Sequence, residues 1–396
     1  MVRLSDFGED QRIRVRKTRQ GYLAFVSGPI PREFDYVPEL VNALSEADRA
    51  LGELSGVGQR LANPQMLIRP YMRREAVLSS RIEGTQSSLA QLLLFEANAP
   101  THRPDDAREV LNYVRALEWG IASLPRLPIS HRMVLGLHRR LLEGVRGPRS
   151  TPGRFRTTQN WIGPEGSPIE KAVFVPPPPE ALQALLDDWE KYIHEADSTP
   201  PLLRCALIHY QFETIHPFID GNGRLGRLLM PLFLIEKNCL SQPLLYLSAF
   251  FETRRDSYYG ALMKGRTTGA LGPWLLLFLE AVKTQAKDAS AKADRLAALE
   301  ADFRRRLRFT RSRVAHALVD EVFGGLFVTA SRVAAREKVT PPSARIAIEQ
   351  LVSAGILREM TGRKSGRVYS SPEVLRILDT EGPEARSTER RSNSRR

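Results

Sequence analysis

Cysteine is scarce in this chain of 396 residues, which contains only Cys205 and Cys239. Two cysteines cannot form the disulfide framework of a small secreted protein, so we expect a reducing compartment and a cytoplasmic protein. No apolar run approaches the roughly 20 residues that a membrane-spanning helix requires. The first residues, MVRLSDFGED, also lack the apolar core of a secretory signal. The sequence therefore predicts no membrane partner.

Acidic residues are in the minority, because 45 Asp and Glu stand against 58 Lys and Arg and leave a net charge of +13. Such an excess suits phosphate-bearing or nucleic-acid partners. Here the excess is spread along the chain, its densest patch is the tail ARSTERRSNSRR, and no long basic stripe carries interleaved aromatic residues. A generally arginine-rich composition is the simpler explanation, so the charge alone assigns no partner.

Apolar residues recur at three- and four-residue spacing over most of the chain, which predicts a mainly α-helical fold. Changes of composition divide the chain into an N-terminal helical region, a central helical core, a charged connecting helix, a C-terminal domain and a disordered tail. We expect these parts, in the same order, at residues 1–100, 101–282, 283–308, 309–380 and 381–396.

Two segments break the helical pattern. In RFRTTQNWIGPEGSPIEKAVFVPPPPE, β-forming residues gather in two short runs around GPEGSP, which predicts a small β-hairpin that ends at the prolines. Between residues 309 and 380, the predicted order is helix, helix, turn, helix and two strands. Thr329 is the expected N-cap of the second helix, and Gly355 ends the third. This order is typical of a winged helix-turn-helix domain.

The stretch HPFIDGNGRLGRLL, which begins at His216, combines a base, a carboxylate, glycines and two arginines. Its letters satisfy the dinucleotide-binding pattern G-x-G-x-x-G at Gly221, Gly223 and Gly226. That pattern requires a preceding strand, whereas the preceding LLRCALIHYQFETI has helical spacing, so we exclude a dinucleotide-binding fold. The local order is helix, glycine-rich loop, helix. The second helix directs unpaired N–H groups and its positive dipole end at the loop, where they suit a phosphate group.

The other residue types of this stretch complete a nucleotide site. Arg224 and Arg227 lie on one face of the first helical turn and can each bind phosphate oxygens through two N–H groups. Asp220 is a hard oxygen ligand, suited to a magnesium ion that bridges phosphates. His216 can take the proton of an attacking hydroxyl, and Asn222 offers an amide donor. These residues predict phosphate at a helix N-terminus, with a metal ion and a base nearby.

The segment HPFIDGNGRLGR resembles the motif of the Fic (filamentation induced by cAMP) family, H-P-F-x-[D/E]-G-N-G-R-x-x-R, at every fixed position. The resemblance implies a protein adenylyltransferase that moves AMP from ATP to a Ser, Thr or Tyr hydroxyl of a target protein, and also to its own chain. It implies that His216 is the general base and that Asp220 holds Mg²⁺, or Mn²⁺ in its place. The implied phosphate ligands are Asn222 for the α-phosphate, the Gly221 and Gly223 amides for the anion hole, Arg224 for the β-phosphate and Arg227 for the γ-phosphate.

The predicted hairpin lies where Fic cores carry a flap. By resemblance, the flap clamps the target side chain and holds the target backbone as an added strand. Phe174 and Val175 are the expected clamp residues.

The segment LSSRIEG resembles the inhibitory helix of the same family, [S/T]-x-x-x-E-[G/N], at Ser79, Glu83 and Gly84. By this resemblance Glu83 pairs with Arg227, the partner of the γ-phosphate, so that ATP binds without a reactive geometry. In some relatives the same glutamate also takes part in the removal of AMP.

The predicted winged helix leaves a second function open. The helix SARIAIEQLVSAG can enter a DNA major groove through Arg345, with Arg363, Lys364 and Arg367 on phosphates. Such domains also dock targets or dimerise, and we favour docking or a homodimer here. The alternative to the transferase is an ATP-sensing transcriptional regulator that transfers no AMP. A zinc site at Cys205 and His209 is set aside, since no second pair completes it.

Overall fold

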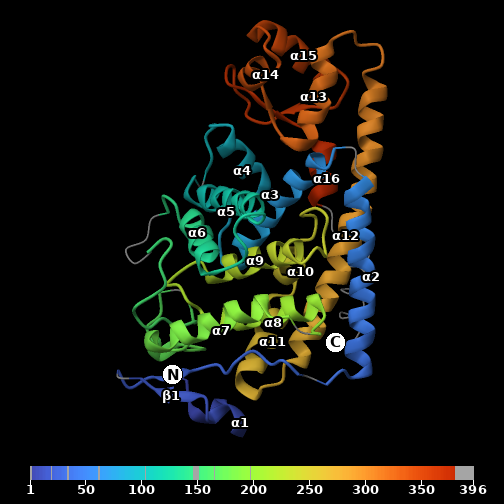
Figure 1. Cartoon of the computed structure of the whole chain (residues 1–396). Helices are drawn as coiled ribbons and strands as arrows, with labels where there is room; N and C mark the ends of the chain where they lie inside the picture. The colour runs from blue at the N-terminus through green and yellow to red at the C-terminus, as the bar shows by residue number, and fades with distance from the viewer. Residues whose placement is uncertain are drawn as a thin grey trace, which may run out of the picture. The chain divides into compact units, whose positions relative to one another are not determined.

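The structure, a computed structural model, describes residues 2–18, 20–33, 35–60, 63–102, 104–145, 151–164, 166–196 and 198–379. Within these ranges the protein is mainly α-helical with a few short strands, which confirms the mainly α fold class (Figure 1). The tail predicted at 381–396 lies outside the described residues. Among the described helices, none has the length and apolar character needed to cross a bilayer.

The described chain forms two compact units. The first comprises residues 1–51, 112–240 and 247–283, and the second comprises residues 52–111, 241–246 and 284–396. The last break between the units follows residue 283, next to the boundary expected at 282, and the boundaries expected at 100 and 308 stay predictions. Three helices cross from one unit to the other, and these are α2 (Pro38–Arg60), α5 (Pro104–Ser123) and α12 (Gly272–Arg306).

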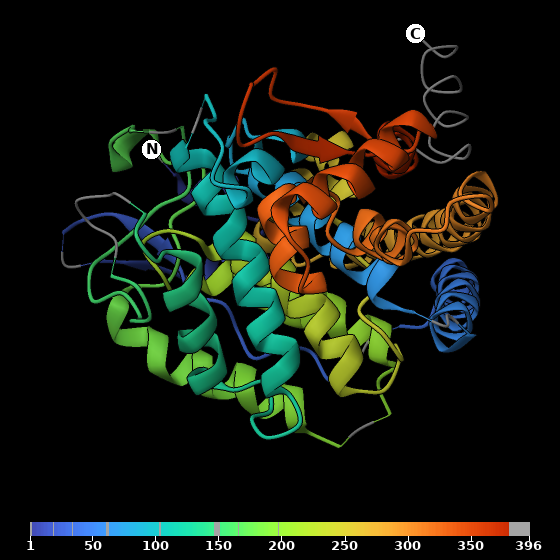
Figure 2. The same ribbon diagram turned by 90° about the horizontal axis from the view of Figure 1, so that it is seen from above.

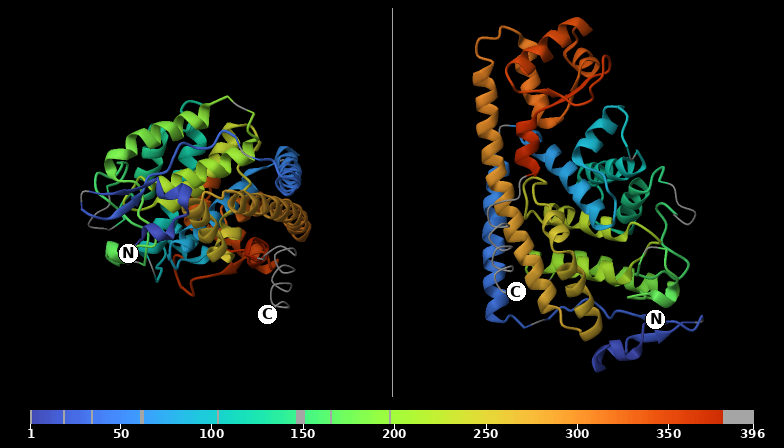
Figure 3. Two further views of the ribbon diagram at one scale, coloured as in Figure 1. Left: turned by 90° about the horizontal axis from the view of Figure 1, so that it is seen from below. Right: turned by 180° about the vertical axis from the view of Figure 1, so that it is seen from behind.

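The first unit is organised around α8 (Pro201–Ile215), in which every residue from Leu202 onward is buried. A helix that is apolar on all sides needs neighbours on all sides. It packs against α7 (Leu182–His194) and α9 (Asn222–Glu236), and α7 and α8 lie side by side in Figures 1 and 3. The remaining helical elements of this unit are α1 (Glu9–Arg12), α6 (His131–Leu141), α10 (Ser248–Thr253), α11 (Arg255–Thr268) and the 3-10 turns Leu4–Asp6, Ile169–Lys171 and Pro179–Ala181.

An N-terminal hairpin, which the sequence pattern did not predict, belongs to the first unit. Strands β1 (Val15–Lys17) and β2 (Leu23–Phe25) are antiparallel, with Arg16 opposite Ala24. The Phe25 N–H donates to the Val175 carbonyl at 2.9 Å, so the end of β2 lies next to the second arm of the predicted flap.

The flap itself is smaller than the predicted hairpin. Its two arms meet in a single antiparallel bridge between Ile162 and Phe174. The prolines that follow Val175 cannot donate backbone hydrogen bonds, which explains why the second arm is so short.

The second unit joins an N-terminal helix pair to the C-terminal region. The pair is α3 (Gln65–Ile82) and α4 (Leu89–Glu96), tied by a buried ion pair between Arg73 and Glu96 of 3.0 Å. Helix α3 packs on α13 (Arg313–Gly324) and α16 (Pro372–Asp379). Its long buried face explains this packing, because it includes apolar residues through most of its length.

The C-terminal region carries three helices, three short strands and a final helix. After α13 come β3 (Val328–Thr329), α14 (Ala330–Glu337), α15 (Pro341–Ser353), β4 (Arg358–Glu359) and β5 (Val368–Ser370). The strands form one antiparallel sheet in the order β3-β5-β4. Figure 2 shows the long connection between β4 and β5, coloured red. Thr329 caps α14, and Gly355, with φ of 70°, follows α15, as the sequence predicts.

Candidate active site

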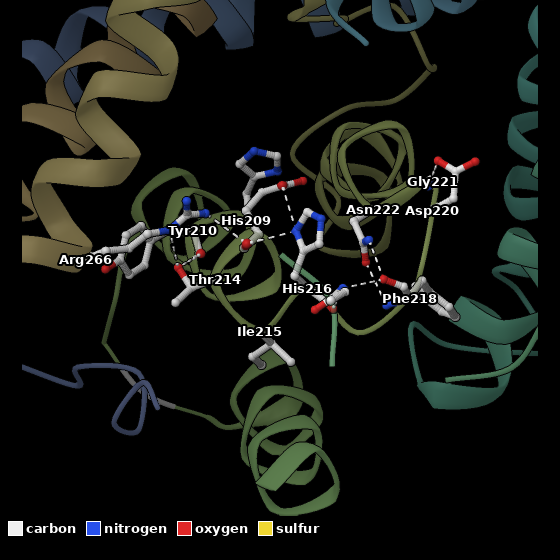
Figure 4. Close-up of polar contacts among 12 residues, drawn as sticks. His209, Tyr210, Thr214, Ile215, His216, Phe218, Asp220, Gly221, Asn222 and Arg266 are labelled. Atoms are coloured by element: carbon white, nitrogen blue, oxygen red, sulfur yellow. Dashed lines mark hydrogen bonds and ion pairs between the residues drawn. The ribbon is translucent and has the colours of Figure 1, made fainter. Parts of the chain in front are cut away.

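The histidine motif forms the predicted helix–loop–helix, shown in Figure 4. Helix α8 ends because His216 adopts a left-handed conformation, with φ of 50°. Gly221, with φ of 80°, is the N-cap of α9 and meets no steric penalty there. His216 is not a glycine, and this conformation costs it about 1–2 kcal/mol. Contacts around the loop must offset that strain.

The His216 imidazole has a defined tautomer and charge. Its Nδ1 lies 3.3 Å from the Glu213 carbonyl oxygen, which can only accept, so Nδ1 carries the proton and Nε2 has a free lone pair. Burial, and then the Arg266 guanidinium, lower the pKa of His216 from 6.5 to about 3. The side chain nevertheless keeps 18% of its surface exposed. At neutral pH it is therefore an uncharged base that a substrate can reach.

The backbone of the loop is held by two buried polar residues that precede it in sequence. The Arg156 guanidinium donates to the carbonyl oxygens of His216 at 2.9 Å and of Pro177 at 2.5 Å. Asn160 donates its amide hydrogens to the carbonyls of His216 at 3.1 Å and Phe218 at 2.8 Å. Burial lowers the pKa of Arg156 to about 10, so it stays charged. Sequence reasoning missed both residues.

His138 supports the loop from α6. Its ring stacks on Phe218, with centroids 3.7 Å apart. Its Nδ1 accepts the Gly153 N–H at 2.9 Å, so its Nε2 carries the proton and donates to the Asp220 carbonyl at 3.0 Å. Burial lowers the pKa of His138 to about 4. Sequence reasoning also missed His138, whose neutral ring fixes the loop on which Asp220 sits.

A second buried cation, Arg266 of α11, links the flap to the base. Its Nη2 donates to the Glu213 carbonyl at 2.9 Å, and its Nε donates to Thr214 Oγ1 at 3.2 Å (Figure 4). The guanidinium carbon lies 4.4 Å from the centre of the Phe174 ring. Arg266 therefore contacts the same carbonyl as the His216 ring and also the flap.

The predicted phosphate ligands gather at the start of α9. Arg224 and Arg227 are 4% and 1% exposed, which leaves two guanidiniums with little water around them. The N–H groups of Asn222 and Gly223 belong to the first turn, where the helix itself supplies no acceptor. The Gly221 N–H instead donates to Asp220 Oδ1 at 2.5 Å. The site is therefore positive, as an anion site requires.

The Asn222 side chain serves the loop itself. Its Oδ1 accepts the Phe218 N–H and its Nδ2 donates to the Phe218 carbonyl, both at 2.9 Å (Figure 4). One amide hydrogen remains for a ligand. The contact with an α-phosphate stays a prediction.

Asp220 fits the metal role in its exposure and chemistry. Its side chain is 55% exposed, and Oδ1 lies 3.3 Å from Arg224 Nη2. Among the described residues no cluster of three or more His, Cys, Asp or Glu side chains is suited to a metal ion. A bound Mg²⁺ or Mn²⁺ would thus have Asp220 as its protein ligand and would take its other ligands from phosphate and water.

Burial contradicts the predicted clamp. Phe174 and Val175 are 0% and 3% exposed, because Phe7 and Phe25 of the N-terminal segment cover them. Neither can contact a target side chain in this conformation. The exposed apolar residue of the flap is Val173, at 59%.

The predicted inhibitory residues lie at the end of α3, in the second compact unit. Ser79 is fully buried within the helix. Glu83 is the exposed C-cap residue, and Gly84 follows it with φ of 97°. The end of the helix at a left-handed glycine follows the usual pattern. The pairing of Glu83 with Arg227 stays a prediction.

Residues 41–122 match the family described as "Fic/DOC family N-terminal", and residues 128–234 match the "Fic/DOC family". The matched residues are therefore similar to a Fic domain and to the region that precedes it. The motif from His216 to Arg227 lies within the second match. Helices α8 and α9 thus carry the predicted base and the predicted phosphate ligands within the matched region.

Curated relatives of the Fic domain are named "Protein adenylyltransferase Fic". The relative from Drosophila grimshawi is 32% identical over 200 residues, which are 49% of this chain and 38% of the relative. The relative from Drosophila willistoni is 35% identical over 160 residues, or 39% of this chain and 30% of the relative. The chain therefore spans well under half the length of these relatives.

A crystal structure of a Fic family protein from Desulfovibrio desulfuricans G20 has the same fold as this chain. The two align with a TM-score of 0.57 and 20% identity over 87% of this chain and 98% of the other. At that identity the likeness concerns the fold alone.

Proposed function

We propose that the protein is an adenylyltransferase that transfers AMP from ATP to a Ser, Thr or Tyr hydroxyl of a target protein. The names of the curated relatives support this reaction class. The observation that carries the proposal is the neutral, partly exposed His216 imidazole beside a buried cationic helix start. One group accepts a proton, and the other binds negative charge.

In this reaction the target oxygen attacks the α-phosphorus of ATP, and the bond to the bridging β-phosphate oxygen breaks. His216 Nε2 takes the hydroxyl proton, and pyrophosphate leaves with the bonding electrons. The lone pair on Nε2 is available at neutral pH because Nδ1 holds the ring proton against Glu213. Arg156 and Asn160 keep the ring in place through the His216 carbonyl.

The nucleotide phosphates would lie against the first turn of α9. The Asn222 and Gly223 amides face the developing charge, and Arg224 and Arg227 neutralise the leaving pyrophosphate. Asp220 would hold Mg²⁺ or Mn²⁺, which when bound neutralises phosphate charge. Val173 of the flap would contact the target next to the acceptor hydroxyl.

Labelled ATP tests the proposal directly. Incubation with Mg²⁺ and α-labelled ATP should label the chain itself or a protein of a cell extract, and His216→Ala should abolish the label. Because Glu83 is proposed to inhibit the wild type, Glu83→Gly is assayed alongside it. Binding of ATP by folded wild-type and Glu83→Gly chains that both label nothing would refute the proposal. That result would favour a regulator that only senses ATP.

An inhibitory role for Glu83 is the second part of the proposal. The match of Ser79, Glu83 and Gly84 to the inhibitory pattern supports it. Glu83→Gly should increase self-labelling, because Arg227 then binds the γ-phosphate without competition. Glu53→Gly, an exposed glutamate change within helix α2, is the control for loss of charge in a helix. Equal labelling by wild type and Glu83→Gly would refute this role.

The C-terminal region is proposed to be a winged helix. The order α13, β3, α14, α15, β4, β5 and the β3-β5-β4 sheet support this. Its helix α15 would be the recognition helix and the β4–β5 connection the wing.

A further inference from the structure

The winged-helix region carries a groove that the transferase reaction does not use. It has a volume of about 500 Å³ and lies between α15, the start of α14 and the β4–β5 connection, with Ala97 after α4 at its edge. Its lining includes Arg345 and Glu349 of α15 and Lys364 and Arg367 of the connection. The charged side chains that line the groove are therefore three cations and one carboxylate.

The groove cations are available to a ligand. Arg345, Lys364 and Arg367 are exposed. Within the described part of the chain, the Arg345 guanidinium and the Lys364 ammonium take part in no hydrogen bond or ion pair. Nearby Glu359 accepts the backbone N–H groups of Thr361 and Gly362, both at 2.7 Å, and it also interacts electrostatically with Arg367. Its charge therefore offsets Arg367 in part, and Arg345 and Lys364 are the main groove cations.

The connection holds its cations in a defined shape. Gly362 and Gly366 have φ of 65° and 64°, which closes the turn tightly. The Arg367 Nε donates to the Arg363 carbonyl at 2.7 Å, across that turn. The positive charges therefore project from a fixed loop beside α15.

The start of α15 determines what kind of contact it can make. Pro341 and Pro342 have no N–H, and Thr340 Oγ1 accepts the Ser343 N–H at 3.4 Å. This helix end consequently offers few donors of its own to a phosphate. Binding must come from side chains, of which Arg345 and the 58%-exposed Ile346 lie on the second turn.

We infer that this groove binds the backbone of duplex DNA, with α15 facing the major groove and the β4–β5 connection on phosphates. An exposed helix flanked by unpaired cations complements a wide, anionic groove. Double-stranded RNA fits less well, because its deep, narrow major groove does not admit a helix. A protein partner would need a larger apolar centre than Ile346 and the 40%-exposed Val352 provide.

Duplex binding by the full-length chain at several salt concentrations tests the inference. A fluorescent DNA duplex should bind at low salt, with an affinity that falls as salt rises. Lys364→Gln and Arg345→Gln should each weaken binding on the order of tenfold at 0.1 M salt and lower the salt slope by about 0.9 per lost phosphate contact. Arg305→Gln is the matched control, since Arg305 is 69% exposed on α12, outside the groove.

The outcomes are distinct. Weaker binding by both groove variants, with wild-type melting temperatures and a wild-type Arg305→Gln, supports the inference. Equal losses in all three variants would mean attraction to net charge alone and would overturn it. So would absence of duplex binding at low salt, or equal binding of double-stranded RNA with the same dependence on Lys364. AMP transfer is not part of this measurement, so the two proposals fail independently.

Discussion

Arg156 offers the most informative test of how this site is built. Its Nε donates to the carbonyl of His216, whose left-handed backbone costs about 1–2 kcal/mol. A hydrogen bond from a charged donor contributes about 1.5–3 kcal/mol, so this one alone offsets the strain. In Arg156→Met only Asn160 still holds that carbonyl, with a neutral bond of about 1 kcal/mol. The left-handed conformation of His216 should then no longer be the most stable one.

The predicted consequence is a fall in kcat on the order of 100-fold, as expected for a base displaced by about 1 Å. The KM for ATP should change little, because the proposed phosphate ligands belong to α9. Stability should fall by about 2–5 kcal/mol, since the Pro177 carbonyl also loses its donor. Labelling rates well below the melting temperature, together with denaturant unfolding, separate the two effects.

Arg140→Met is the matched control, because Arg140 lies over Trp119 at 3.9 Å, away from the loop. It should lose little activity. A folded Arg156→Met with unchanged kcat would refute the reasoning, because the His216 conformation would then need no support. A rise in KM without a fall in kcat would also contradict it.

Four further outcomes are expected. With the pKa of His216 at about 3, labelling rates should show no acid limb near pH 6.5, and such a limb in a pH profile would contradict a neutral base. The pKa of His138 is about 4 in the folded chain and 6.5 in the unfolded chain, so the unfolded chain binds the proton more tightly. The free energy of unfolding should therefore fall by up to about 3 kcal/mol as pH drops from 6.5 to 4. Unfolding curves of His138→Gln should show a smaller fall. Gly226→Ala should destabilise by about 1–3 kcal/mol in denaturant, since its Cβ would lie 2.5 Å from Glu213 Oε1. Val173→Asp should lower transfer to a protein target without changing the KM for ATP, which target-labelling kinetics can check.

The sequence predicts the helices and the motif well, for a physical reason. Helices α8 and α9 are long, mostly apolar segments, and the residues from His216 to Arg227 are adjacent in sequence, so the local sequence is enough to identify them. Thr329 and Gly355 could be assigned to helix ends for the same reason, because their residue types alone are typical of those positions.

The support of the site is not visible in the sequence because it depends on distant contacts. Arg156 is 60 residues from His216, and His138 is 82 residues from Asp220. Neither belongs to a recognisable spacing. The burial of Phe174 has the same origin, since Phe25 covers it from a three-residue strand, too short to show alternation. An isolated residue acquires such a role only through tertiary packing.

The packing of α3 on α13 and α16 has a consequence for the regulation of the chain. The helix that ends at Glu83 is also a core element of the C-terminal half, so Glu83 cannot be displaced by moving a free arm. Removing residues after α12 would strip the apolar side of α3 of its neighbours and expose it to water. A shortened chain should therefore aggregate, and the proposed inhibitory role of Glu83 has to be tested in the intact chain.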